Sequence, residues 1–190
     1  MLSLLQQIRD YIAYGDGALI LPQIQHALFA LGILVTDFLL EKRYKWMNAA
    51  MALAGCGFSG YALWILQRSV SSGGERYGFG GSIVIDSFTI FFGFVFLAAT
   101  VLVILLSVRY LELEDEHHGE YYSLMLFAVV GMMFMASGVD LVVQFIALET
   151  MAISFYVLAG FLRRERRSNE GALKYLLLGA FSSGILAYGF

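Results

Sequence analysis

The sequence predicts an all-α integral membrane protein with about six transmembrane helices, and its composition is the first indication. Of the 190 residues, 59% are hydrophobic and only 14% are charged, whereas about 25% of residues are charged in a typical soluble domain. The chain has 20 glycines and a single proline, which suits closely packed membrane helices. The apolar residues also fall into six runs, each near the roughly 20 residues that a helix needs to span a bilayer.

The six runs predict a single membrane domain over residues 1–190. We expect helices at 22–40, 46–66, 87–108, 121–136, 140–161 and 171–190. Pro22 can open the first helix because the first turn does not use the N–H that proline lacks. Strands of a membrane β-barrel would alternate apolar and polar residues and be about half as long. Residues 69–81 are polar and glycine-rich, and predict a loop or short hairpin between the second and third helices.

Basic residues are distributed unevenly between the two sides of the predicted membrane. The loops after the first, third and fifth helices contain eight lysines and arginines, while the other side contains three, Arg9, Arg68 and Arg76. Because cytoplasmic loops carry the excess of lysine and arginine, we expect these three loops in the cytoplasm and the N-terminus outside.

The sixth apolar run ends at Phe190, the last residue, with no polar flank after it. Intact membrane proteins seldom stop inside a span. We therefore expect the chain to be the N-terminal part of a longer protein, truncated at its C-terminus.

Glu149 places an ionisable carboxyl group near the middle of the fifth run. A charge at that depth costs about 2.5–3.5 kcal/mol on insertion scales, so the side chain should face protein or water rather than lipid. Tyr156 lies seven residues further, on the same face of a helix, and could share a small aqueous cavity with it. Intramembrane ionisable groups are functional by default. The alternative is a carboxyl group that stays neutral or hydrogen-bonded between helices.

Lys174 and Asp37 are the other charged residues that we single out within the predicted helices. Lys174 lies a few residues inside the cytoplasmic end of the sixth helix, where its ammonium group could instead extend to the lipid headgroups. It is much nearer to that end than Glu149, so a direct salt bridge between the two is not expected. Asp37 lies near the cytoplasmic end of the first helix, and an interfacial role is expected of it.

The sequence lacks the residue patterns that are typical of several functional classes. The single cysteine, Cys56, excludes an internal disulfide, a redox pair and a multi-cysteine metal site. His117 and His118 lack the spaced ligand set of a metal site, which favours a solvated acidic loop. Small-residue tracts such as Ala54–Gly60 favour close helix contact. There is no nucleophile with a base, no Gly-rich nucleotide loop and no basic stripe. We expect no catalytic or metal site, and contact with the lipid bilayer rather than nucleic acid.

Two blocks of the sequence resemble a known family. Glu170–Gly189, with the tract Lys-Tyr-Leu-Leu-Leu-Gly-Ala that begins at Lys174, is similar to the sixth helix of subunit N of bacterial NADH-quinone oxidoreductase, respiratory complex I. Ala147–Leu158, which contains Glu149, is similar to the fifth helix of that family. The 25-residue interval from Glu149 to Lys174 fits as well. The resemblance covers essentially the whole chain, and the lysine tract favours subunit N over its paralogues L and M.

The resemblance implies a proton-pumping, antiporter-like subunit of about fourteen helices built from two half-repeats, in the inner membrane of a bacterium. It implies that Glu149 and Lys174 belong to the intramembrane proton path, with Asp37 and Tyr156 as our secondary candidates. It implies no redox cofactor in this chain, because NADH, FMN, iron-sulfur clusters and quinone are bound by other subunits. The expected partners are other complex I membrane subunits, including neighbouring antiporter-like subunits.

Two departures from the family restrict what these residues can do alone. The chain stops before the seventh helix, whose lysine is the usual ion-pair partner of the helix-five glutamate, and it lacks the second half-repeat. Two alternatives remain: a subunit of a related cation/proton antiporter or membrane-bound hydrogenase, and a structural membrane subunit whose charges serve only assembly.

Overall fold

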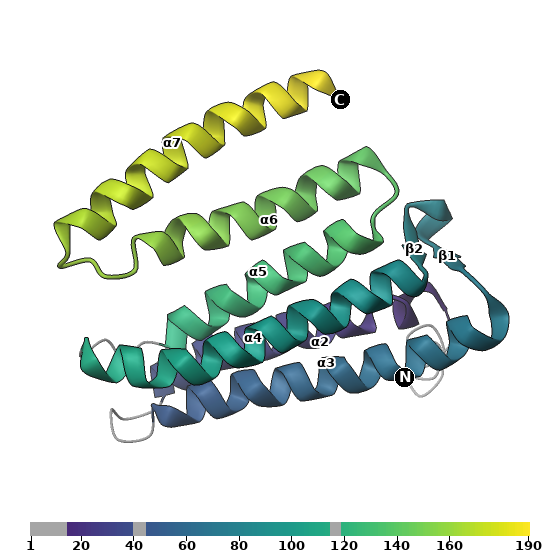
Figure 1. Ribbon diagram of the computed structural model, residues 1–190, viewed down its shortest axis with the longest axis horizontal. Helices are drawn as coiled ribbons and strands as arrows, with labels where there is room; N and C mark the ends of the chain where they lie inside the picture. Colours follow the sequence, from purple (N-terminus) through teal and green to yellow (C-terminus); the bar gives the residue numbers. More distant parts are fainter. Residues whose placement is uncertain (1–14, 40–44, 115–118) are drawn as a thin grey trace, which may run out of the picture.

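The computed structural model describes residues 15–39, 45–114 and 119–190, which form a layered bundle of six long α-helices (Figure 1). The helices are α2 (Leu21–Leu39), α3 (Trp46–Gly73), α4 (Ser87–Leu113), α5 (Gly119–Ser137), α6 (Leu141–Ala159) and α7 (Arg166–Gly189). The other elements are the 3-10 turns η1 (Asp16–Ala18) and η3 (Phe79–Gly81) and the strands β1 (Arg76–Gly78) and β2 (Ile83–Ile85). The predicted all-α membrane fold is confirmed.

The described residues include five helices, α3 to α7, that are long and apolar enough to cross a membrane. The chain is therefore a multi-pass membrane protein. α2 carries Gln23, Gln25 and His26 in its first two turns. Some helices extend beyond their apolar runs: α3 continues to Gly73, and α7 begins at Arg166 rather than at residue 171. Hydropathy marks the part of a helix that lies in hydrocarbon, whereas helical hydrogen bonds continue into the polar interface.

Helices α2 to α5 form the well-packed part of the bundle. Most of their buried apolar side chains belong to one cluster that includes Ile33, Ile104 and Leu126, each with no exposed surface. A second cluster joins Leu66 of α3 and Ile90 of α4 to the hairpin. Glycines allow the helices to approach closely. A Cβ atom on Gly55 would lie 2.9 Å from the Cβ of Phe29. The small-residue tract around Gly55 therefore serves helix packing, as the sequence indicates.

A two-stranded hairpin closes one end of the bundle, which we call the hairpin end. β1 and β2 pair antiparallel, with Tyr77 opposite Val84, and Gly80 and Gly81 turn the chain with φ angles of 68° and 92°. The N–H of Val139 donates to the carbonyl of Ser82 over 2.9 Å, which ties the hairpin to the α5–α6 turn. The sequence predicted a loop or hairpin over 69–81, and this range was wrong: residues 69–73 are still helical, and the hairpin continues to Ile85.

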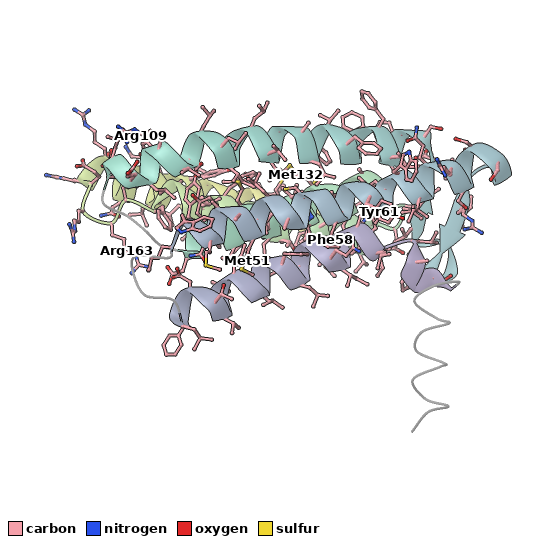
Figure 2. The ribbon with its side chains drawn as sticks, turned by 90° about the horizontal axis from the view of Figure 1, so that it is seen from below. Met51, Phe58, Tyr61, Arg109, Met132 and Arg163 are labelled. Carbon is pink, nitrogen blue, oxygen red and sulfur yellow. The ribbon has the colours of Figure 1, made fainter. Side chains whose placement is uncertain are left out.

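The opposite end of the bundle carries most of the basic side chains, and we call it the basic end. Figure 2 shows Arg109 of α4 and Arg163 of the α6–α7 turn extending from this same end. A guanidinium nitrogen of Arg163 lies 3.7 Å from a carboxylate oxygen of Glu120, at the start of α5. The lead-in before residue 15 and the loop residues 40–44 and 115–118, with His117 and His118, lie outside the described residues.

Helices α6 and α7 form the outer layer (Figure 1). α6 packs along α5, and α7 packs along α6 at the edge of the molecule. Only Ala147 and Ser154 of α6 are fully buried, and α7 contains no buried residue. This open layer contains Glu149, Tyr156 and Lys174, the candidate residues from the sequence.

Candidate functional site

Helix α6 begins at a well-defined turn that fixes the depth of Glu149. The Asp140 carboxylate caps the helix by accepting a hydrogen bond from the N–H of Val142 over 2.7 Å. The side chain of Gln144 donates to the carbonyls of Met135 and Gly138 over 3.1 and 2.7 Å. These contacts join the end of α5 to the first turns of α6, and Glu149 follows near the middle of the helix.

One face of α6 lies very close to α5. A Cβ atom on Gly131 of α5 would lie 2.7 Å from both the carbonyl oxygen of Ala147 and the amide nitrogen of Met151. Ala147 and Ser154 are buried on this face, with 3% and 4% of their surface exposed. Glu149 is two residues after Ala147, about 200° around the helix axis. Its side chain therefore starts from a different face than the one against α5.

The contacts between α6 and α7 show what lies opposite Glu149. Near the turn, a Cβ atom on Gly160 would lie 2.8 Å from the Cβ of Ala172. At the other end of the pair, the rings of Phe145 and Phe190 are 6.1 Å apart. Between these contacts the helices run antiparallel. The α7 residues at the level of Glu149 are thus those between Gly179 and Phe190.

The carboxyl group of Glu149 has one buried oxygen. Its Oε1 atom is buried and has no hydrogen-bond partner among the described residues. A buried carboxyl oxygen within a membrane helix is costly without a donor, and buried polar groups are normally paired with protein or ordered water. Such an oxygen needs its own proton, a water molecule or a donor from outside the described residues.

Tyr156 lies on the same face of α6 and makes the principal contacts with α7. Its ring meets the ring of Tyr175 edge-on, with centroids 4.7 Å apart. Its hydroxyl group occupies the space that a side chain at Gly179 would fill. Ser183, one turn further along α7, lies beside the same hydroxyl group. Glycine at position 179 thus makes room for the phenol between the helices.

Lys174 lies outside this contact. Its ammonium nitrogen is 2.5 Å from a carboxylate oxygen of Glu170, and the two side chains are 70% and 56% exposed. Lys174 follows the α6-facing Ala172 by two residues and so lies on another face of α7. No ion pair joins it to Glu149 within the described part of the chain, as their different depths in the sequence led us to expect.

Asp37 belongs to a separate polar cluster at the basic end. The side-chain amide of Asn48 donates to its carboxylate over 2.5 Å, and the ammonium nitrogen of Lys45 is 3.6 Å away. The first residue of α5, Gly119, packs directly against Asp37 and Asn48. Asp37 therefore joins three helices at their ends.

Sequence reasoning missed a buried polar group at His26. The Nδ1 atom of His26 lies 2.6 Å from the hydroxyl oxygen of Ser59, and that hydroxyl donates to the carbonyl of Pro22 over 3.0 Å. Because the serine proton is used by Pro22, Nδ1–H is the donor to Ser59. A histidine inside an apolar run is a signal for such a partner. The described residues contain no cluster of three or more metal-ligating side chains.

The chain is similar to subunits of respiratory membrane complexes. The family model for the transmembrane region of NADH:quinone oxidoreductase and Mrp antiporters matches residues 138–190. NADH-quinone oxidoreductase subunit N 2 of Solibacter usitatus is 52% identical over 180 residues, which cover 92% of this chain and 36% of that protein. Subunit N 1 of Koribacter versatilis is 49% identical over 185 residues, covering 95% of this chain and 36% of that protein.

Solved structures share the fold. A chain of respiratory complex I from Thermus thermophilus aligns with a TM-score of 0.70 and 24% identity, covering 88% of this chain and 35% of that chain. A chain of the archaeal membrane-bound sulfane sulfur reductase aligns with a TM-score of 0.74 and 20% identity, covering 89% of this chain and 35% of that chain. The chain is therefore a relative of the subunit N proteins of NADH-quinone oxidoreductase, and it spans about a third of their length.

Proposed function

We propose that the chain belongs to a proton-translocating membrane subunit of a NADH-quinone oxidoreductase, and that Glu149 is a proton site within it. The observation that carries this proposal is the buried, unpartnered Oε1 atom of Glu149 in the middle of a spanning helix. A structural carboxyl group would be expected to have its hydrogen bonds satisfied by the helices around it. A proton site must instead leave an oxygen free to exchange.

In this proposal Lys174 is a second proton site, nearer the basic end. Among the described residues its ammonium group pairs with Glu170, which leaves room for a further partner in this proposal. Asp37 and Tyr156 are secondary positions, Asp37 at the basic end and Tyr156 beside Glu149. This membrane domain is oriented with the basic end in the cytoplasm, since the positive-inside rule applies to its loops.

The proposed mechanism is electrostatic. Electron transfer and quinone chemistry in other subunits, which hold the FMN, iron-sulfur clusters, NADH and quinone, change the electric field at Glu149. A cation brought near Glu149 favours its ionised form, and removal of that cation favours its protonated form. Alternation between the two moves a proton from the cytoplasm towards the other side of the bacterial inner membrane. Other membrane subunits of the complex, including antiporter-like ones, are the proposed partners.

The test is Glu149→Gln in membrane vesicles that contain the assembled complex. Glutamine keeps the shape but cannot carry the proton, so the rate of NADH-driven proton translocation per assembled complex should fall by about tenfold or more, since an acid–base group contributes about 10²–10⁴-fold. Glu112→Gln is the matched control, because Glu112 is exposed and its partner among the described residues is Arg109, at the end of α4.

Three results are informative in this experiment. Loss with Glu149→Gln and normal translocation with Glu112→Gln supports the proposal. Normal translocation by both variants contradicts it and favours a purely structural membrane subunit. Translocation that requires sodium in place of protons would favour a subunit of a related cation/proton antiporter.

A further inference from the structure

The contact between α6 and α7 provides a polar route that starts at Glu149. Glu149 and Tyr156 are seven residues apart on α6, which is about 10.5 Å along the axis at 1.5 Å per residue. Side chains on a helix lean towards its N-terminus, so the long phenol of Tyr156 extends from its own position back towards Glu149. The contact of the Tyr156 hydroxyl with Gly179, which lies further along antiparallel α7 than Ala172, agrees with this direction.

Helix α7 supplies the second hydroxyl group on this route. Ser183 lies beside the Tyr156 hydroxyl, in the α7 segment between Gly179 and Phe190 that runs opposite Glu149. It is one of the few partly buried residues of a helix that is otherwise exposed. The Ser183 hydroxyl is therefore placed between the Tyr156 hydroxyl and the level of Glu149.

The residues around Tyr156 leave space for its hydroxyl group as well as for its ring. The phenol oxygen lies over Gly179, where even an alanine side chain would collide with it. An apolar contact between α6 and α7 would be served as well by a phenylalanine and a small side chain. The ring is also held from one side by Tyr175, so its hydroxyl group has a fixed position.

We propose that the hydroxyl groups of Tyr156 and Ser183 form a proton relay that connects Glu149 with the basic end of the α6–α7 pair. This inference rests on the proposed role of Glu149. In one transfer, a water molecule on the basic side gives a proton to the Tyr156 oxygen, and Tyr156 passes its own proton to Ser183. Ser183 in turn passes its proton, directly or through one water, to the free Oε1 of Glu149. Each hydroxyl group gains one proton and loses one, so only the ends of the relay change charge.

The test compares Tyr156→Phe with Tyr175→Phe in membrane vesicles containing the assembled complex. Both changes remove one phenol oxygen from the same pair of rings, but only Tyr156 lies over Gly179 and beside Ser183. We expect Tyr156→Phe to lower NADH-driven proton translocation per assembled complex by about tenfold, the effect on a rate of losing one hydrogen bond in the rate-limiting step. Tyr175→Phe should retain the normal rate.

The solvent deuterium isotope effect on translocation separates a relay from a structural role. It should change in Tyr156→Phe and stay normal in Tyr175→Phe, because only the first variant lacks a hydroxyl group through which protons pass. A purely structural role would alter the amount of assembled complex and leave the isotope effect of the remaining complex unchanged, which would overturn the relay.

Glu149→Gln distinguishes failure of the relay from failure of the proposed function. Normal translocation by Tyr156→Phe with a defective Glu149→Gln overturns the relay alone, whereas normal translocation by both overturns the proposed function as well. Should Tyr156→Phe not assemble, Ser183→Ala decides: about tenfold slower translocation supports the relay, and a normal rate overturns it.

Discussion

Helices α2 to α5 and the pair α6–α7 differ in how deeply they bury their polar side chains. In the inner helices, His26, Ser59 and Ser123 are fully or almost fully buried and hydrogen-bonded across helix boundaries. In the outer pair, Glu149 keeps a free buried oxygen, and Lys174 is mostly exposed. A polar group that fixes two helices needs a satisfied partner, whereas one that exchanges protons needs a vacant position and access to water. Buried oxygens without a partner among the described residues also occur at Gln23, Gln25 and Asn48 of the inner helices. The outer pair is distinguished because its unpartnered oxygen belongs to an ionisable group, Glu149, within a spanning helix.

The largest loss of stability is expected from a substitution at Gly131, where α5 and α6 are in close contact. Gly131→Ala would place a methyl group 2.7 Å from backbone atoms of Ala147 and Met151, and the helices would have to separate. We expect a loss of about 1–3 kcal/mol of stability, measured as a lower thermal midpoint of the solubilised protein.

Gly184→Ala provides the control for that substitution in the outer layer. No atom lies within 4 Å of a Cβ at this position in α7, and alanine favours helix by about 1 kcal/mol relative to glycine. The thermal midpoint should stay the same or rise slightly. Equal losses from the two changes would contradict the distinction between a packed scaffold and an open outer pair.

A second loss of stability, of comparable size, is expected from Ser59→Ala. This change leaves the Nδ1–H of His26 and the carbonyl of Pro22 without their partner inside the bundle, which costs about 1–3 kcal/mol for a buried group. Ser182→Ala on α7 removes a hydroxyl group that bonds only to the carbonyl of Leu178 in its own helix, and should be nearly neutral. Chemical denaturation of both variants in detergent measures the difference, and a neutral Ser59→Ala would show that the histidine contact is dispensable.

The sequence predicted the scaffold better than the geometry of the site, for a physical reason. The bilayer forces each spanning segment to be long, helical and apolar, so composition alone predicts the helices. A charge such as Glu149 is also conspicuous within an apolar run. Which helix Glu149 faces depends on rotation and register between helices, and these are set by close contacts such as those at Gly131 and Gly179. A helix that is apolar on every side does not encode that rotation in its hydropathy.

His26 and Tyr156 are two residues whose contacts with other helices could not be predicted from the sequence. His26 could be recognised as a polar residue in an apolar segment, but its partner Ser59 is 33 residues away and lies in a tract whose glycines indicated packing. Tyr156 was predicted beside Glu149 from their helical spacing. Its position over Gly179 could not be predicted, because that contact requires the antiparallel register of α6 and α7.

The smallest effect is expected at Lys174, and it tests whether the outer pair contains one proton site or two. The ion pair with Glu170 is exposed, and such pairs contribute about 0–1 kcal/mol, so Lys174→Ala should leave the thermal midpoint nearly unchanged. Proton translocation per assembled complex should still fall, though less than in Glu149→Gln, because Lys174 lies outside the contact that holds Tyr156. Glu170→Ala removes the same ion pair while keeping the ammonium group. If both variants lower translocation equally, the ion pair is what matters; if Lys174→Ala changes only the amount of protein in the membrane, Lys174 is an interfacial anchor and not a proton site.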